Sequence, residues 1–328
     1  MFLAFIVALL MAFVPAFFFS WLIYWLDRYE KEPKLLLFGA FFWGSFVSII
    51  GALIVSLIFN AGFFLIIQEE TLAEIAGGSI TAPIVEEFWK GLAVLMIFLL
   101  FRREFDSILD GIVYGAIVGL GFAATENVLY FLGQYSEGGW EGLFTNILIR
   151  VGLFAWVHPF CTAFTGIGFA VSRINRNPLI KFLAPIVGYG LAIFAHSFHN
   201  TSLVFVTGLG SLGLIILAEW FGWLMFFGFI VWMISHEQGL LKTHLKEEQA
   251  NGLITQGQYK TAVSFFQFGT RLASLGDGTY RSTSRFYQVC GELAHKKEQL
   301  AKHGDEGGNA SIIASLRMEL ALLSPKSK

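Results

Sequence analysis

Seven polar residues stand inside segments of the chain that are otherwise apolar, and their types are those from which hydrolytic centres are built. They are Glu86, Glu87, Lys90, Glu126, His158, His196 and Asn200. Carboxylates and imidazoles together bind a divalent metal ion and its water, or they activate water by general base catalysis without a metal. An ionisable side chain within a membrane span costs about 3 kcal/mol on insertion scales, so each of these residues needs a reason to be there.

The spacing of these residues predicts which of them act together. Lys90 follows Glu86 by four positions and Glu87 by three, so on a helix its ammonium group reaches either carboxylate. Either glutamate is a candidate for the base that activates water, and the spacing does not choose between them. His196 and Asn200 are also four positions apart, and we expect this pair to donate hydrogen bonds to a tetrahedral oxyanion.

A metal ion is one of two mechanisms that these residue types allow. Two or three carboxylates with two imidazoles are enough to hold a divalent metal ion and its water. The alternative is a glutamate-activated water, assisted by Glu126 and His158, with no cofactor. In either case we expect Lys90 to position the glutamates.

Each feature also has a structural interpretation. The Glu86–Lys90 stretch alone suits a buried ion pair, and Glu126 with Asn127 suits hydrogen bonding between helices. His199 is expected to be structural. Four charged residues are expected to lie outside the chemistry: Arg150 and Glu219, which would pair with each other or face water, and Asp106 and Asp110, which would form a solvated helix end. Because so many polar groups are expected in one layer of the bundle, a single hydrolytic site is favoured over separate structural roles.

Charge is scarce in this chain and unevenly distributed. Of 328 residues, 55% are hydrophobic and 14% charged, with a mean hydropathy of +0.65, whereas soluble domains carry about 25% charged residues. Residues 1–234 contain 10 Lys and Arg with 15 Asp and Glu, and residues 235–328 contain 12 and 9. This composition excludes a soluble enzyme of two ordinary domains, and the lack of a basic stripe excludes a nucleic-acid binder. It predicts an all-α, polytopic membrane helix bundle with a small helical tail.

Seven apolar stretches are long enough to cross about 30 Å of hydrocarbon as helices. They are residues 2–26, 36–59, 80–101, 110–133, 146–172, 179–206 and 211–234. The first lacks the features of a cleaved signal peptide and is expected to stay as a helix. Apolar character continues past the second, which suggests a short re-entrant or interfacial piece around 60–79. At a rise of about 1.5 Å per residue, the candidate carboxylates and the polar pair of the sixth stretch come out in one layer of the outer half of the membrane.

Basic residues in the connecting loops predict the orientation. Alternate loops hold eight Lys and Arg residues, and the loops between them hold none. The eight are Arg28, Lys31, Lys34, Arg102, Arg103, Arg173, Arg176 and Lys181. The positive-inside rule then puts the N-terminus outside and the C-terminus in the cytoplasm of a multi-pass protein of the plasma membrane. We therefore expect a membrane-embedded bundle over residues 1–234 and a soluble helical cytoplasmic tail of unassigned role over residues 235–328.

The order of the polar motifs resembles that of one family, the PrsW-type intramembrane proteases, which are relatives of the CAAX-prenyl endopeptidase (CPBP) superfamily. The family pattern is Glu-Glu-x-x-Lys, then Phe-x-x-x-Glu, then a single His, then His-x-x-x-Asp or Asn, on successive spans. This sequence has, in that order, Glu86-Glu87-x-x-Lys90, Phe122-x-x-x-Glu126, His158 and His196-x-x-x-Asn200. Asn200 stands where several members have Asp, and Pro159 follows His158 where a small residue is common. The resemblance covers about residues 1–234 and not the tail.

The resemblance implies a protease-like bundle, usually a metalloprotease, that acts as an intramembrane endopeptidase on a membrane-anchored protein such as an anti-sigma-factor-like regulator. With it, the expected ion is Zn²⁺ and the expected ligands are Glu126, His158 and His196. Cleavage on the outer side of the membrane agrees with the polar layer that loop charge places there. The alternative within enzymes is a CAAX-type or bacteriocin-processing membrane peptidase. The alternative of another class is a membrane transporter or binding scaffold, because buried Glu, His and Arg residues also form proton relays. Neither the substrate bond nor the oligomeric state is indicated.

Overall fold

A computed structural model describes residues 1–66, 69–305 and 307–327 of the chain, and within these residues every regular element is a helix. The expected all-α class is therefore confirmed. The chain forms two compact units, of which unit 1 is Met1–Leu26 with Glu32–Phe227 and unit 2 is Asp27–Lys31 with Gly228–Lys328. All of the candidate site residues belong to unit 1.

Unit 1 consists of long helices joined by short loops and wider helical turns. Its α-helices are α1 (Phe2–Leu26), α2 (Lys34–Phe42), α3 (Ile49–Ile66), α4 (Glu70–Ala76), α5 (Ala82–Leu100), α6 (Ile108–Ile147), α7 (Val157–Ile174), α8 (Pro178–Val204) and the first part of α9 (Leu209–His244). Between them lie the π-helical turns η1 (Trp43–Ser48), η2 (Gly77–Thr81) and η4 (Leu148–Leu153) and the 3₁₀ turn η3 (Arg102–Glu104). The expected interfacial piece around 60–79 is the end of α3, α4 and the start of η2, and its residues 67 and 68 lie outside the described chain.

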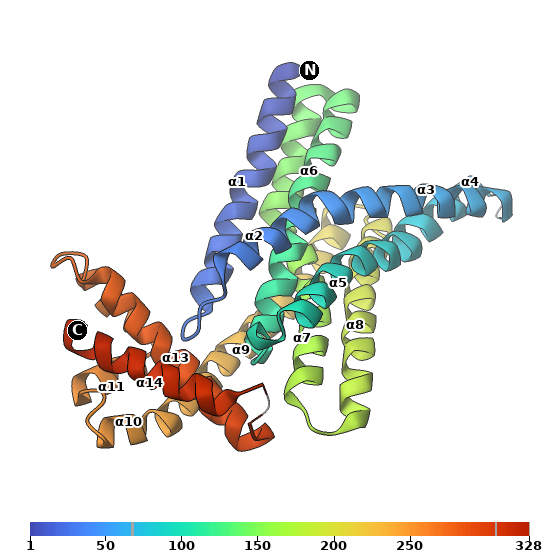
Figure 1. Ribbon diagram of the computed structural model, residues 1–328. Helices are drawn as coiled ribbons and strands as arrows, with labels where there is room; N and C mark the ends of the chain where they lie inside the picture. Colours follow the sequence, from blue (N-terminus) through green and yellow to red (C-terminus); the bar gives the residue numbers. More distant parts are fainter. Residues whose placement is uncertain (67–68, 306, 328) are drawn as a thin grey trace. The chain divides into compact units, whose positions relative to one another are not determined.

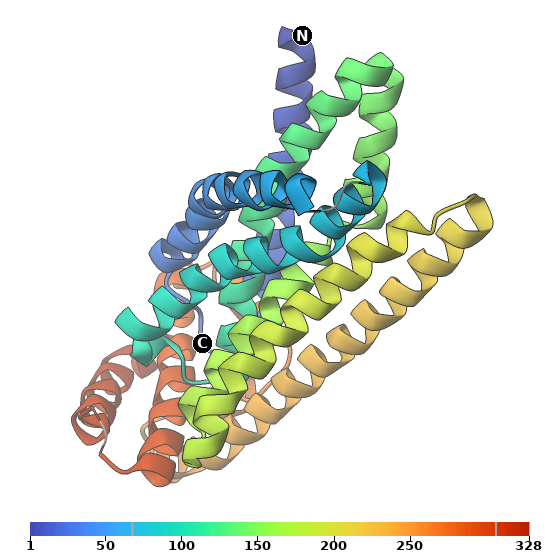
Figure 2. The same ribbon diagram turned by 90° about the vertical axis from the view of Figure 1, so that its right-hand side faces the viewer.

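Five segments of the described chain are long and apolar enough to cross a membrane: Phe2–Leu26, Lys34–Phe59, Ile108–Ile174, Pro178–Val204 and Leu209–Ala250. The third has 67 residues, far more than one crossing of about 30 Å requires. It turns back on itself at Gly139, where a φ of 61° suits a residue without a Cβ atom (Figures 1 and 2). The helix α5 is not among the five, because Glu86, Glu87 and Lys90 interrupt its apolar sequence. The sequence led to seven expected spans rather than five for two reasons. It included α5, and it counted the two passes of the folded-back segment as separate spans.

The helix α6 lies at the centre of unit 1, and residues 109–124 are buried at every position. Small residues let neighbouring helices approach it closely, as is common where helices pack in a membrane. Gly111, Gly115 and Gly119 recur at every fourth position and lie against the backbone of α7. A Cβ atom on Gly119 would lie 2.5 Å from the carbonyl oxygen of His158. These glycines therefore determine how closely α7 can bring that histidine to α6.

The same use of small residues positions α8. A Cβ atom on Gly188 would lie 2.4 Å from the carbonyl oxygen of Phe164, so α7 and α8 are in backbone contact at this level. The two helices run side by side in both views (Figures 1 and 2). Their close contact fixes the relative depth of the histidines that each helix carries.

The start of α6 corrects one expectation from the sequence. Asp110 is buried rather than solvated, and its carboxylate accepts hydrogen bonds from the backbone N–H groups of Asp106 and Ser107, each at 2.7 Å. Ser107 in turn accepts from the backbone N–H of Asp110 at 3.2 Å, which completes a capping box. The first turn of a helix leaves backbone donors without partners, and Asp110 satisfies them in place of water.

Unit 2 contains the rest of α9 and a set of shorter helices. These are α10 (Lys246–Ala250), α11 (Gln256–Ala262), α12 (Gln267–Ala273), α13 (Tyr280–His303) and α14 (Asn309–Leu323), followed by the 3₁₀ turn η5 (Ser324–Lys326). The short segment Asp27–Lys31 belongs to the same unit. Within it, Arg28 donates to the carbonyl oxygen of Phe265 at 2.9 Å, and the Tyr29 carbonyl oxygen would lie 2.2 Å from a Cβ atom on Gly291.

Candidate active site

Four helices of unit 1 supply one polar cluster. The helix α5 carries Glu86, Glu87 and Lys90, α6 carries Glu126, α7 begins with His158 as its second residue, and α8 carries His196. These six expected site residues are linked by contacts between their side chains. The seventh, Asn200, has a different partner, which is described below.

Glu87 is the fully buried acceptor around which the cluster is organised. Its Oε1 lies 2.7 Å from Lys90 Nζ and 3.0 Å from His196 Nδ1. Its Oε2 accepts a hydrogen bond from Thr162 Oγ1 at 3.0 Å. Both oxygens therefore have partners, as a buried carboxylate requires. Glu87 orients these neighbours, whereas the more accessible carboxylate is that of Glu86, whose side chain is 12% exposed.

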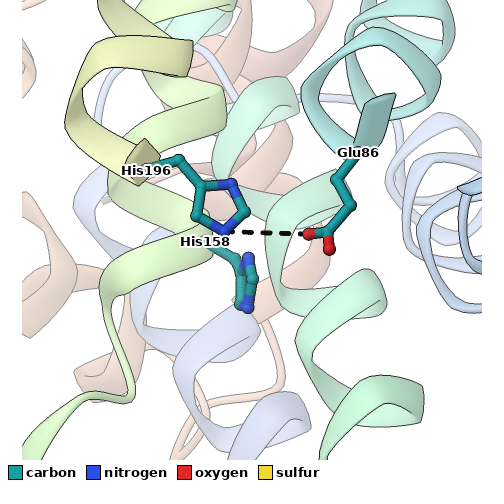
Figure 3. A group of neighbouring side chains, drawn as sticks. All are labelled: Glu86, His158 and His196. Carbon is teal, nitrogen blue, oxygen red and sulfur yellow. Dashed lines mark ion pairs between the residues drawn. The ribbon is translucent and has the colours of Figure 1, made fainter. Parts of the chain in front are cut away.

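Glu86, His158 and His196 offer their ligand atoms to one small region (Figure 3). One such atom from each residue lies within 4.8 Å of the other two. Glu86 Oε2 is 3.7 Å from His196 Nε2 and 3.5 Å from Lys90 Nζ. One carboxylate with two imidazoles is a ligand set of catalytic zinc sites, which keep a further position open for water or substrate.

The second nitrogen of each histidine is held by a carboxylate, which is the usual arrangement for histidines that bind metals. His196 Nδ1 contacts Glu87, and His158 Nε2 lies 2.9 Å from Glu126 Oε2. An ionised carboxylate only accepts hydrogen bonds, so His158 Nε2 donates and its Nδ1 keeps a lone pair. Lys90 Nζ lies 3.2 Å from that Nδ1, so the ammonium group and a metal ion would compete for it. The residues fit a metal ion in donor type and in the support of each histidine.

Glu126 does not belong to this ligand group, which differs from the expected set of Glu126, His158 and His196. Its carboxylate accepts from the Arg150 guanidinium as well as from His158. Arg150 Nε also donates to Asn127 Oδ1 at 2.6 Å, and its guanidinium carbon lies 3.9 Å from the centre of the Tyr130 ring. Glu126 therefore contacts His158 from the side, and the three residues with ligand atoms within 4.8 Å of one another include Glu86 where the sequence suggested Glu126.

Two further expectations differ from the structure. Asn200 Nδ2 donates to the carbonyl oxygen of Gly78 at 2.9 Å, so in this structure its side-chain amide ties α8 to η2 and makes no contact with His196 or the rest of the cluster that is described above. Glu219 pairs with His199 at 2.8 Å, and Arg150 pairs with Glu126. In each case the partner is set by the rotation and depth of a neighbouring helix, which local spacing does not determine.

Two residues that contact the cluster, Arg150 and Thr162, are not among the site residues expected from the sequence. Arg150 carried a usable signal, because an ionised arginine inside an apolar stretch requires an acidic partner. Thr162 carried a weaker one, because it follows His158 by four positions and so shares its face of α7.

The apolar helices and the converging carboxylates and imidazoles define a class: a multi-pass membrane protein with the donor set of a hydrolytic metal centre. A comparison with protein families agrees with this class. The family described as "PrsW family intramembrane metalloprotease" matches residues 32–233, which is more than half of the chain and includes the whole cluster. The chain belongs to this family, and the resemblance drawn from the motifs is confirmed in this respect.

Individual relatives carry the same family name. The chain is 34% identical over 136 residues to Protease PrsW of Bacillus subtilis (strain 168), which covers 40% of this chain and 55% of that protein. It is 32% identical over 168 residues to Protease PrsW of Geobacillus kaustophilus (strain HTA426), which covers 50% of this chain and 68% of that protein. It is 34% identical over 128 residues to Protease PrsW of Clostridioides difficile (strain 630), which covers 39% of this chain and 48% of that protein.

The similarity is partial in extent. The chain spans about half of the length of the curated relatives that it matches, with 55% for the first of them. The family match ends at residue 233, so most of unit 2 lies beyond it. No solved structure matches the chain.

Proposed function

We propose that this chain is an intramembrane endopeptidase that hydrolyses a peptide bond of a membrane-anchored protein. One observation carries the proposal: Glu86, His158 and His196 converge from three helices with ligand atoms within 4.8 Å of one another. Membership of a family of intramembrane metalloproteases supports it. The substrate class we propose is a single-span protein such as an anti-sigma-factor-like regulator.

Glu86 has the central role in the proposed chemistry. A carboxylate has two oxygens, so Glu86 can hold an ion with one and accept a proton with the other. Water attacks the peptide carbonyl carbon, its proton passes to Glu86 and then to the leaving amine, and the C–N bond breaks. Zn²⁺ held by Glu86, His158 and His196 would supply Lewis-acid polarisation of the carbonyl and of water.

The surrounding residues orient this centre. Glu87 holds His196 and Lys90, and Glu126, itself held by Arg150, holds His158. Lys90 is buried with its Nζ 3.5 Å from Glu86 Oε2, and it is proposed to stabilise the developing oxyanion. This role passes to Lys90 because the Asn200 amide is engaged with η2.

We further propose that the site lies in the outer half of the plasma membrane and that the tail is cytoplasmic. The distribution of Lys and Arg over the loops supports this orientation. A second observation also supports it: the loop Asp27–Lys31 and the tail belong to one compact unit. Segments that fold together outside the bilayer lie on the same side of it, and this loop carries Arg28 and Lys31.

The test is proteolysis of a single-span substrate fusion by the purified full chain in proteoliposomes. Glu86→Gln is expected to lower the rate of cleavage by about 100-fold or more, since it removes the proton acceptor. The matched control is Glu141→Gln, a substitution at an exposed glutamate of the second leg of α6. Equal cleavage by wild type and Glu86→Gln would contradict the proposal.

The same experiment separates the other functions. Mapping the cut beside a prenylated cysteine would favour a CAAX-type peptidase instead. Proton flux across the vesicles without cleavage, abolished by Glu126→Gln, would favour a transporter.

A further inference from the structure

A second polar group is buried in unit 1 outside the proposed active site, at a cavity between α7, α8 and α9. The cavity has a volume of about 270 Å³ and is lined mainly by aromatic and aliphatic side chains, among them Phe160, Phe164, Phe198 and Trp223. Two polar residues line it as well, His199 from α8 and Glu219 from α9. The mechanism above uses neither of them.

The pair is incompletely satisfied. His199 Nδ1 lies 2.8 Å from Glu219 Oε1, and the Phe154 ring meets the His199 ring edge-on with centroids 5.0 Å apart. The Glu219 residue is only 8% exposed, yet its Oε2 has no hydrogen-bond partner within the described part of the chain. A buried polar atom without a partner costs about 1–3 kcal/mol, so such an atom in a native protein needs an explanation, and a bound hydrogen-bond donor is one.

The surroundings of the cavity are apolar and face away from the protein core. Phe194 and Phe198 on its rim are 68% and 48% exposed, and they belong to a helix that is long and apolar enough to span a membrane. Exposed aromatic residues on such a helix face lipid. The molecules with access to this cavity are therefore those dissolved in the bilayer.

We propose that this cavity binds a single-chain amphiphile, such as a long-chain alcohol or a monoacylglycerol, whose hydroxyl group donates a hydrogen bond to Glu219 Oε2. The apolar lining takes the part of the alkyl chain next to the hydroxyl group, the rest of the chain extends into the lipid, and the carboxyl oxygen takes the one donor. The volume limits the occupant, because an α-helix with its side chains is about 10 Å across and does not fit in about 270 Å³. A transmembrane substrate helix is thus excluded as the occupant.

The cavity and the active-site cluster share two helices. Cys161 lines the cavity three positions after His158 on α7, and His199 follows His196 by three positions on α8. An occupant therefore packs against the helices that present both imidazoles of the proposed active site. The binding site itself does not depend on the proposed proteolytic function.

The experiment uses two photoreactive probes that differ in one group, a diazirine-labelled hexadecanol and the matching diazirine-labelled hexadecane. Purified full-length protein in proteoliposomes is irradiated with each probe, and labelled peptides are identified by mass spectrometry. In wild type, we expect the alcohol to label peptides of α7, α8 and α9 at the cavity about tenfold more than the alkane, which is the effect of one buried hydrogen bond. Equal labelling by the two probes would overturn the proposal, because it would mean that water or nothing satisfies Glu219.

Two variants test the site itself. Glu219→Leu should abolish the preference for the alcohol and keep labelling by the alkane, which also reports that the fold is intact. Gly222→Leu should reduce labelling by both probes, because Gly222 lines the cavity and a Cβ atom there meets open space. The matched control is Gly213→Leu, on the same helix, where a Cβ atom also meets open space but the residue does not line the cavity. Should Glu219→Leu not fold, Gly222→Leu decides alone: labelling by the alcohol equal to that of Gly213→Leu would contradict the proposal.

Discussion

The charged cluster of unit 1 and the ion pairs of unit 2 use the same residue types in two different ways. In unit 2, Glu248 is buried and meets two cations, Lys297 at 2.9 Å and Arg317 at 2.6 Å. These contacts join α10 to α13 and α14. In unit 1, Glu87 is likewise buried and fully engaged, but the contacts of Glu86 beside it are longer, with Lys90 at 3.5 Å and His196 at 3.7 Å.

This difference distinguishes charged residues that hold helices together from charged residues that could take part in chemistry. A structural ion pair uses all of its acceptors to hold helices together, because an unpaired buried charge is costly. A site keeps one acceptor accessible while its neighbours are fixed around it. By this criterion Glu248 belongs to a structural ion pair, and we propose that Glu87 and Glu126 are positioning groups and that Glu86 is the group with capacity for a ligand.

The largest expected effect is on stability, at Glu87. Glu87→Leu leaves the Lys90 ammonium buried without its closest acceptor, and we expect a loss of about 3–5 kcal/mol in the free energy of unfolding. The double variant Glu87→Leu with Lys90→Met should recover a large part of this loss, since the uncompensated charge is gone. Thermal unfolding of the purified chain in detergent measures both. A Glu87→Leu variant as stable as wild type would show that this pair is not as buried as the distances indicate.

A smaller effect is expected where α6 meets α7. Gly119→Ala places a Cβ atom only 2.5 Å from the His158 carbonyl oxygen, so the two helices must separate. We expect a loss of about 1–3 kcal/mol in the free energy of unfolding, and a lower rate of cleavage because His158 moves. Gly133→Ala on the same helix is the control, because a Cβ atom there meets open space. Equal stability and cleavage rates of the two variants would mean that the glycine contact does not position His158.

The support of Glu126 provides the next test. Arg150→Met removes the ion pair that holds Glu126 against His158, and we expect cleavage to slow by about 10–100-fold with the fold retained. Arg281→Met, at an exposed arginine of unit 2, is the control. Cleavage rates and thermal unfolding together distinguish a positioning role from a structural one. Cleavage by Arg150→Met at the wild-type rate would contradict the positioning role of Arg150.

The smallest effect is expected in unit 2, for the partly exposed ion pair of Arg285 with Glu319. Hydrogen bonding from Arg285 lowers the pKa of Glu319 below its ordinary value. The stabilisation is then present at neutral pH and is lost as the pH falls below the unfolded pKa of about 4.3 towards the lowered folded value. We expect about 0.5 kcal/mol, since the Glu319 side chain is 38% exposed. Hydrogen exchange of α13 and α14 at pH 7 and pH 4, compared with Glu319→Gln, measures the difference, and an unchanged pH dependence in that variant would contradict it.

The sequence predicted the members of the cluster better than their pairing. Residue type, helical spacing and depth were sufficient to group Glu86, Lys90 and His196, because polar residues in apolar helices must face one another. His158 joined this group by its residue type and by the order of the motifs rather than by its depth. Depth does not specify helix rotation, so the exchange of Glu126 for Glu86 in the ligand group was not predicted. Helix rotation is set by backbone contacts such as that of Gly119 with His158.

Other features of the fold were predictable only in outline. The all-α class followed from composition and from long apolar stretches. The reversal of the long α6–α7 segment at Gly139 inside continuous helical structure did not, since a loop was expected there. The capping role of Asp110 was hidden because an acidic residue next to a loop usually faces water. Each of these depends on a tertiary contact or a single backbone angle that local sequence does not specify.

We propose that Glu86, His158 and His196 form one metal-holding hydrolytic centre supported by Glu87 and Glu126. Elemental analysis of the purified chain and its variants is the decisive measurement. We expect about one zinc per chain in wild type and in Glu141→Ala, and loss of the zinc in Glu86→Ala, His158→Ala and His196→Ala. Full zinc content in Glu86→Ala, or a fully active wild type without zinc, would contradict it.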